Sequence, residues 1–218
     1  MTEFNKIVMN LQKIEIELKK RLKYPYIWGT RQNNYYNGLT NFIYQTKDFE
    51  TLLKEIDVRF KGKSDYQAFF NYALNRWYNF WSAQAVEQIF CQCKGVTPAL
   101  NSMDRLIDFS IDGVNFDHKT SVYPKGYAFP LEDAMSNKGS LIDWLYENQS
   151  QQQRHHLKNR LFIIVYSKDG KHWKVKSEIT LLAGIIEDYV KNFDKDKLLK
   201  FTLEDNLIAL SDIIWLIK

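Results

Sequence analysis

Two carboxylates and an amine occur close together in the segment Leu106–Ser121, which reads LIDFSIDGVNFDHKTS. Asp108 stands near its start, and Asp117 and Lys119 stand near its end. The rest of the segment alternates apolar and polar residues around a central Asp-Gly dipeptide, which strongly favours a two-residue hairpin turn. Acidic side chains beside an amine can hold a divalent metal ion and activate a water molecule. This segment is therefore the first candidate for a reactive site.

A turn at Asp-Gly fixes which residues oppose each other in the hairpin. Because side chains alternate between the two faces of a strand, Asp108 and Asp117 are expected side by side on the polar face. Lys119 and then Ser121 follow on that face, whereas His118 falls on the opposite face, where we expect packing or a hydrogen bond. The predicted pairs are Ile111–Val114, Ser110–Asn115, Phe109–Phe116 and Asp108–Asp117. A one-residue bulge at the turn would break this pairing.

Two carboxylates about 5 Å apart across a sheet repel each other. A cation between them, or protonation of one of them, removes the conflict. Mg²⁺ suits the position because it prefers hard oxygen ligands and keeps water and substrate phosphate in its remaining sites. Lys119 would then orient or deprotonate a water, or stabilise charge on a phosphate. The alternative left open is an ordinary exposed hairpin face, with Lys119 paired to a carboxylate across the strands.

The segment resembles the PD-(D/E)xK nuclease superfamily, the restriction endonuclease-like proteins. The resemblance covers about residues 77–167: Asp108 after an apolar run, then Asp-His-Lys at 117–119, then an apolar strand at 160–167. Members of this family typically carry an acid on the preceding helix, and Glu87 in AQAVEQIF matches that position. Ile107 stands where the motif name has proline, and the second acid is Asp rather than the commoner Glu.

The resemblance implies metal-dependent hydrolysis of a phosphodiester, with DNA as the substrate. Asp108 and Asp117 would be metal ligands, Lys119 would position or activate the water, and Glu87 would bind a metal directly or through water. Gln84 lies one helical turn before Glu87, on the same face, and is a secondary candidate, as is Ser121. The cofactor would be Mg²⁺, with Mn²⁺ as a substitute. A homodimer is expected for double-strand cleavage, and a methyltransferase is a further potential partner.

Two other functions remain open at this stage. The chain could be a nucleic-acid-binding or assembly subunit that has the same fold and lacks catalysis. It could also be a helical interaction protein in which the hairpin is only scaffold, in which case no divalent ion would bind. Cleavage of plasmid DNA and calorimetry with Mn²⁺ separate these alternatives.

The remaining elements are inferred from hydrophobic spacing. Residues 24–47 read as loop and turn, residues 124–140 as a polar connection, and the C-terminal segment 206–218 as either strand or helix. A second hairpin is predicted from 160–167 through KDGK into HWKVKS. Strands are predicted in the two hairpins, and helices at about 3–23, 48–58, 64–93, around 141–145 before the Gln run 149–153, and at 178–193.

Together these elements predict an α/β domain with a mixed central sheet flanked by helices, of restriction endonuclease-like type. We divide the chain into an N-terminal helical extension, residues 1–63, and a nuclease-like core, residues 64–218, which together form one compact domain. The aromatic residues between 66 and 90 are expected mainly in the core of the long helix, with base stacking as the alternative.

The composition sets further limits on function. The formal net charge of the 218 residues is +4 and does not by itself require nucleic acid, although the basic excess lies in residues 1–103. Two cysteines, Cys91 and Cys93, fit a reducing compartment, and no secretory signal or membrane-spanning run is evident. We therefore expect a cytoplasmic protein without membrane association.

Three other motifs were considered as sites. Gly-Lys-Ser at 62–64 lacks the first glycine of a phosphate-binding loop, because position 57 is Asp. His155 and His156 are adjacent and would point in different directions on a helix, so they make a poor zinc pair. The neighbouring glutamines and Arg154 could line a DNA groove, although a solvated helix end explains them equally well.

Overall fold

The computed structural model describes residues 9–99, 107–148, 158–202 and 206–218. The chain forms two compact units: Met1–Gln88 with Lys176–Thr180, and Ile89–Val175 with Leu181–Lys218. The division falls inside the long helix α4, Tyr66–Gln92, whereas the boundary predicted from the sequence precedes this helix. Each unit is described separately below.

The described part of the first unit is helical. It contains α1 Leu11–Arg21, α2 Asn34–Leu39, the 3-10 helix η1 Asn41–Tyr44, α3 Phe49–Phe60 and most of α4. The helices predicted at 48–58 and 64–93 are confirmed, and that at 3–23 is confirmed from Leu11 onward. The prediction of loop for 24–47 is wrong for α2 and η1. The Asn33 side chain accepts a hydrogen bond from Tyr36 N and starts α2, but six residues are too few to show a helical period.

The aromatic residues of α4 form the core of the first unit. Tyr72, Trp77 and Tyr78 are fully buried. The indole of Trp77 donates a 2.6 Å hydrogen bond to the carbonyl of Thr46, and the indole of Trp81 donates one of 3.0 Å to Ile43. Buried indoles with backbone partners are core residues, so the core interpretation holds for these side chains.

The second unit contains a six-stranded mixed sheet in the order β1-β2-β3-β4-β6-β5. β3, β4 and β6 run parallel, and the other neighbouring strands pair antiparallel. This confirms the α/β class with a mixed central sheet flanked by helices. The strands are β1 Val96–Pro98, β2 Phe109–Ile111, β3 Val114–Val122, β4 Arg160–Tyr166, β5 Leu199–Thr202 and β6 Ile208–Ile217.

The segment after β4 differs from its prediction as a second hairpin. His172–Ser177 forms the 3-10 helix η2 instead of a strand. The backbone N–H of Ser167 donates to His172 Nδ1 at 2.9 Å, and the N–H of Lys174 donates to the carbonyl of Lys171 at 2.9 Å. These local bonds use groups that a returning strand would need for its ladder. The C-terminal segment, which periodicity did not decide, is the strand β6.

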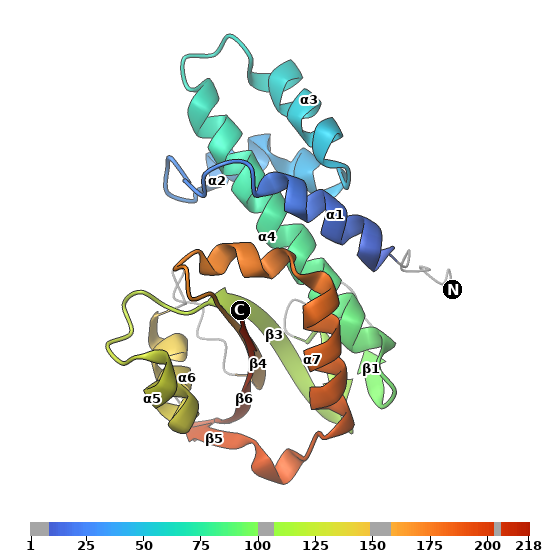
Figure 1. Cartoon of the computed structure of the whole chain (residues 1–218), viewed down its shortest axis with the longest axis vertical. Helices are drawn as coiled ribbons and strands as arrows, with labels where there is room; N and C mark the ends of the chain where they lie inside the picture. The colour runs from blue at the N-terminus through green and yellow to red at the C-terminus, as the bar shows by residue number, and fades with distance from the viewer. Residues whose placement is uncertain (1–8, 100–106, 149–157, 203–205) are drawn as a thin grey trace. The chain divides into compact units, whose positions relative to one another are not determined.

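Helices cover both faces of the sheet (Figure 1). α5 Leu131–Ser136 and α6 Lys138–Asn148 lie on one side, and α7 Ile179–Lys191 lies on the other. α6 and α7 match predicted helices, whereas α5 falls in the stretch 124–140 that was expected to be a polar connection. Leu141, Ile142 and Leu145 of α6 pack with Phe162 and other buried residues of the sheet. Since Lys119 is the register partner of Phe162, it lies on the face that α6 covers.

At two glycines the same Gly→Ala substitution tests how backbone conformation affects stability. Gly184 is exposed in the interior of α7, and a Cβ there would meet nothing within 4 Å. Gly184→Ala should therefore raise the free energy of unfolding by about 0.5–1 kcal/mol, through helix propensity. Gly113 has φ +79°, a conformation that is unfavourable for alanine, and Gly113→Ala should lower the free energy of unfolding by about 1–2 kcal/mol. Urea denaturation measures both changes; equal effects in the two variants would contradict the expectation.

Candidate active site

The hairpin has the predicted turn. Asp112 and Gly113 have positive φ angles of 46° and 79°, as a two-residue hairpin turn requires. Three of the four predicted pairs are confirmed: Phe109–Phe116, Ser110–Asn115 and Ile111–Val114. The fourth, Asp108 with Asp117, does not occur in the ladder, because β2 begins at Phe109 and the N–H of Asp108 donates instead to the carbonyl of Phe116 at 2.9 Å.

Asp108 binds His118 at the point where the ladder stops. Its Oδ2 accepts a hydrogen bond from the backbone N–H of His118 at 2.8 Å and lies 2.6 Å from Nδ1 of the same residue. The carboxylate thus accepts the backbone N–H of His118 in place of a carbonyl of the neighbouring strand β2, whose ladder with β3 stops at Phe109. The ring centroid of His118 lies 6.0 Å from that of Phe109, whose ring stacks on Phe90 at 4.3 Å. The hydrogen bond expected for His118 is confirmed.

Asp117 is held by Arg160, its register neighbour on the parallel strand β4. The guanidinium donates through Nε to Asp117 Oδ2 at 2.6 Å, and Nη2 lies 2.5 Å from the same oxygen. Its carbon lies 6.0 Å from the ring centroid of Tyr146, on α6. The backbone carbonyl of Arg160 accepts a 2.7 Å hydrogen bond from the hydroxyl of Ser211. The arginine is thereby fixed between the sheet and α6.

Arg160 was not identified from the sequence as a site residue. The apolar run at 160–167 reads as a buried strand, so its first residue reads as the end of a core element. A usable signal did exist: a charged residue opening a doubly buried strand needs a partner of opposite charge. Naming that partner required the parallel pairing of β3 with β4 and its register, which the sequence does not provide.

Lys119 is the amine of the site. It lies two residues beyond Asp117, on the same face of β3 and opposite Phe162. The pKa of its ammonium is lowered to about 8, mainly by burial and also by the charge of Arg160, while Asp117 acts in the opposite direction. A fraction of this lysine is therefore neutral just above physiological pH, a condition suited to accepting a proton.

The expected pair of facing, unpartnered carboxylates requires correction. Asp108 is bonded to His118 and Asp117 to Arg160, and residues 117 and 118 point to opposite faces of β3. Each acid is more exposed than its partner, however. The side chains of Asp108 and Asp117 are 24% and 22% exposed, against 6% for His118 and 8% for Arg160. The buried nitrogen groups therefore hold both carboxylates toward solvent.

The donor set can be compared with the needs of a divalent metal. Across the described ranges, no group of three or more His, Cys, Asp or Glu side chains is arranged to hold a metal ion. The partly exposed carboxylates of Asp108 and Asp117 are hard oxygen donors of the kind Mg²⁺ and Mn²⁺ prefer, with water completing the shell. In chemical type and exposure each carboxylate suits such an ion, but the two bond to partners on opposite faces of β3 and do not form one ligand set. An ion at Asp117 Oδ2 would have to compete with Arg160.

The other predicted site residues are distributed between the units. Glu87 is on the part of α4 that belongs to the first unit, and Gln84 donates a 2.9 Å hydrogen bond to its Oε2, as their one-turn spacing suggested. Ser121 is buried on β3, two residues beyond Lys119. His155, His156 and the glutamine run lie outside the described residues.

Two basic side chains of the first unit pack against, or bond to, other parts of that unit. Lys63, in the Gly-Lys-Ser sequence, places its ammonium 5.2 Å from the ring centroid of Phe60 and 5.7 Å from that of Phe69. Arg76, on α4, is 9% exposed and donates to the carbonyl of Asn37 and the hydroxyl of Thr40. Neither residue forms part of a phosphate-binding loop.

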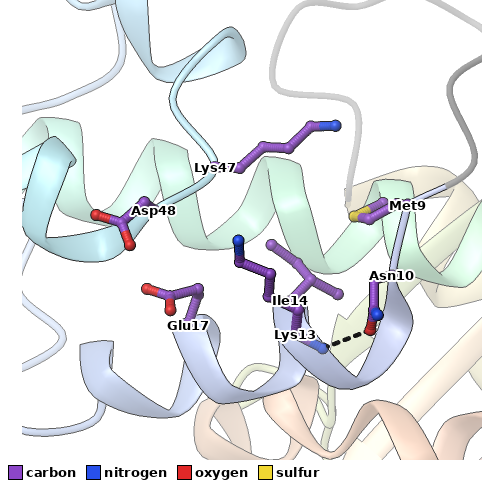
Figure 2. A pocket seen from close by; sticks show the side chains of 7 residues that line it. All are labelled: Met9, Asn10, Lys13, Ile14, Glu17, Lys47 and Asp48. Atoms are coloured by element: carbon purple, nitrogen blue, oxygen red, sulfur yellow. Dashed lines mark hydrogen bonds between the residues drawn. The ribbon is translucent and has the colours of Figure 1, made fainter.

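A hollow of about 200 Å³ lies beside α1 in the first unit (Figure 2). Its carboxylates already serve helix packing: Glu17 accepts from Phe49 N at 2.8 Å, and Asp48 caps α3 by accepting from Thr51 N at 2.8 Å. Its other lining residues are Met9, Asn10, Lys13, Ile14 and Lys47. The arrangement supplies no reactive group.

Among the residues described by the structure, no helix has both the length and the hydropathy needed to cross a membrane. Comparison with known proteins finds no matching family model, no matching curated protein and no matching solved structure.

Proposed function

We propose that the protein is a metal-dependent endonuclease of restriction type that hydrolyses phosphodiester bonds in DNA. The observation that carries the proposal is the juxtaposition of Asp117 and Lys119 on one face of β3. A partly exposed carboxylate is there followed by a half-buried amine with a lowered pKa. These are the two groups that a hydrolase needs for holding a cation and handling the proton of a water.

Each residue has a distinct role in the proposal. Asp117 would contribute a carboxylate oxygen to Mg²⁺ or Mn²⁺, and Lys119 would orient the attacking water or take its proton. Asp108, which bonds to His118 on the other face of β3, is not assigned to the same ion. When bound, the ion supplies positive charge to the phosphate oxygens as negative charge develops on them. Glu87 is a further ligand only by the family resemblance, and Gln84 donates a hydrogen bond to its Oε2.

Several finer features belong to the same proposal. The order of a helix bearing Glu87, the hairpin, α6 and the apolar strand β4 agrees with the order in restriction endonuclease-like proteins. A homodimer would place two such sites on the two DNA strands. A cytoplasmic location and a methyltransferase partner would accompany a restriction activity.

A second candidate function is nucleic-acid binding without catalysis. The Arg160–Asp117 pair favours it, because it neutralises the carboxylate without any metal ion. Lys119 then adds a positive charge that could contact a phosphate. In this alternative the protein would bind DNA equally well with and without divalent ions.

Incubation of the protein with supercoiled plasmid separates the two functions. Cleavage is expected with Mg²⁺ or Mn²⁺ and none with a chelator, while DNA binding followed by gel mobility supplies the second readout. Binding that is unaffected by the chelator, without any cleavage in either metal, would support the non-catalytic alternative. Cleavage that persists in the chelator would contradict metal dependence.

A further inference from the structure

Arg160 occupies one of the two carboxylate oxygens of Asp117. Both Nε and Nη2 are directed at Oδ2, at 2.6 and 2.5 Å, rather than one at each carboxylate oxygen. Charge-assisted hydrogen bonds of this length are among the stronger polar contacts in proteins. The lone pairs of Oδ2 are therefore largely committed to the guanidinium.

The surroundings keep the arginine in this position. Its side chain is 8% exposed, and its carbon lies 5.8 and 6.0 Å from the ring centroids of Phe162 and Tyr146. The hydroxyl of Tyr146 donates in turn to the carbonyl of Lys158 at 3.0 Å, which ties the ring to the chain entering β4. The guanidinium lies beside both rings, whose centroids are 5.6 Å apart, and this packing limits its other conformations, so it is pre-organised toward Asp117.

We propose that Arg160 is an internal counter-ion that competes with the divalent metal for Asp117. In the metal-free protein it neutralises the carboxylate and allows the sheet to close around it. A metal ion at Asp117 must either displace the guanidinium from Oδ2 or bind Oδ1 beside its positive charge, so the observed metal affinity is lower than the intrinsic affinity. The inference rests on the proposed function, because it assumes that Asp117 binds metal.

Mn²⁺ affinity measured by calorimetry and by electron paramagnetic resonance tests this competition without any cleavage assay. Arg160→Gln should bind Mn²⁺ about tenfold more tightly than the wild type, and Asp117→Asn should not bind it at that site. Arg59→Gln is the matched control, because it removes an arginine from the exposed pair with Glu55 on α3 and should leave the affinity unchanged. Unchanged or weaker binding in folded Arg160→Gln would overturn the inference.

The wild type provides an independent test should Arg160→Gln fail to fold. The Hε resonance of Arg160, assigned by its absence from the Arg160→Lys spectrum, should move when Mg²⁺ is added and return with chelator. A resonance that stays fixed while the amide of Asp117 responds to Mg²⁺ overturns the inference and leaves the proposed metal site intact. If no amide near Asp117 responds and Mn²⁺ binds to neither protein, both the inference and the metal site fail.

Discussion

Asp117→Asn is expected to lower the rate of plasmid cleavage by a factor on the order of a thousand. The change keeps the shape of the side chain and removes its charge, so the metal loses its anionic ligand on β3. Single-turnover cleavage in Mg²⁺, with the protein in excess over the plasmid, measures the loss directly. Mn²⁺, which binds nitrogen and oxygen ligands more tightly, should recover part of the rate.

The same substitution also weakens the fold, and this effect has to be separated from catalysis. Arg160 loses its charged partner while remaining buried, which should cost about 1–2 kcal/mol after allowance for the partial exposure of Asp117. Asp212→Asn is the matched control. Asp212, on β6 of the same sheet, is 7% exposed, lies 2.5 Å from the ammonium of Lys138 and accepts a hydrogen bond from Tyr189.

Asp212→Asn should therefore lose a similar amount of stability and keep its cleavage rate, since Asp212 has no place in the proposed site. Urea denaturation gives the first quantity for both variants. If Asp117→Asn, shown to be folded, cleaves as fast as the wild type, Asp117 is not a ligand of a required metal. If both variants lose cleavage equally, the effect is one of stability.

The elements were predictable where a local pattern is strong. The Asp-Gly turn fixed the register of β2 with β3, and the spacing of apolar residues located α3, α4 and α7. The predictions from the sequence fail where a single local hydrogen bond decides the structure. The side-chain cap of Asn33 starts α2, and the bond from Ser167 N to His172 directs the chain into η2. Neither bond produces a periodic pattern.

Which side chains share a face of β3 was predictable, but their partners were not. The face shared by Asp117 and Lys119 follows from alternation along a single strand, which needs no knowledge of the neighbours. The partners of the acids depend on other information. Arg160 reaches Asp117 because β4 is parallel to β3 in one particular register, and His118 meets Asp108 because the ladder stops at Phe109. Long-range pairing and strand ends are properties of the folded sheet.

Lys119→Met is expected to abolish cleavage and to stabilise the protein at the same time. Methionine has a similar length and no charge, so the water loses the group that orients it or accepts its proton, a loss of about 10²–10⁴ in rate. The half-buried ammonium, whose pKa is about 8 in the folded protein, is charged at pH 7 at a cost on the order of 3 kcal/mol. Methionine does not have this cost.

The decisive measurement is how the stability gained by Lys119→Met, relative to the wild type, changes with pH. The facing charges are Arg160 and Asp117, and burial makes the largest contribution to the lowered pKa. Because the folded pKa lies below the unfolded value of 10.5, the unfolded chain binds more protons between pH 8 and 10.5, and wild-type stability rises relative to Lys119→Met over that interval. The advantage of Lys119→Met should thus be full below pH 8 and shrink toward pH 10.5. An advantage that is absent at pH 7, or independent of pH, would mean that Lys119 is solvated, and a solvated lysine would not be poised to accept a proton near neutral pH.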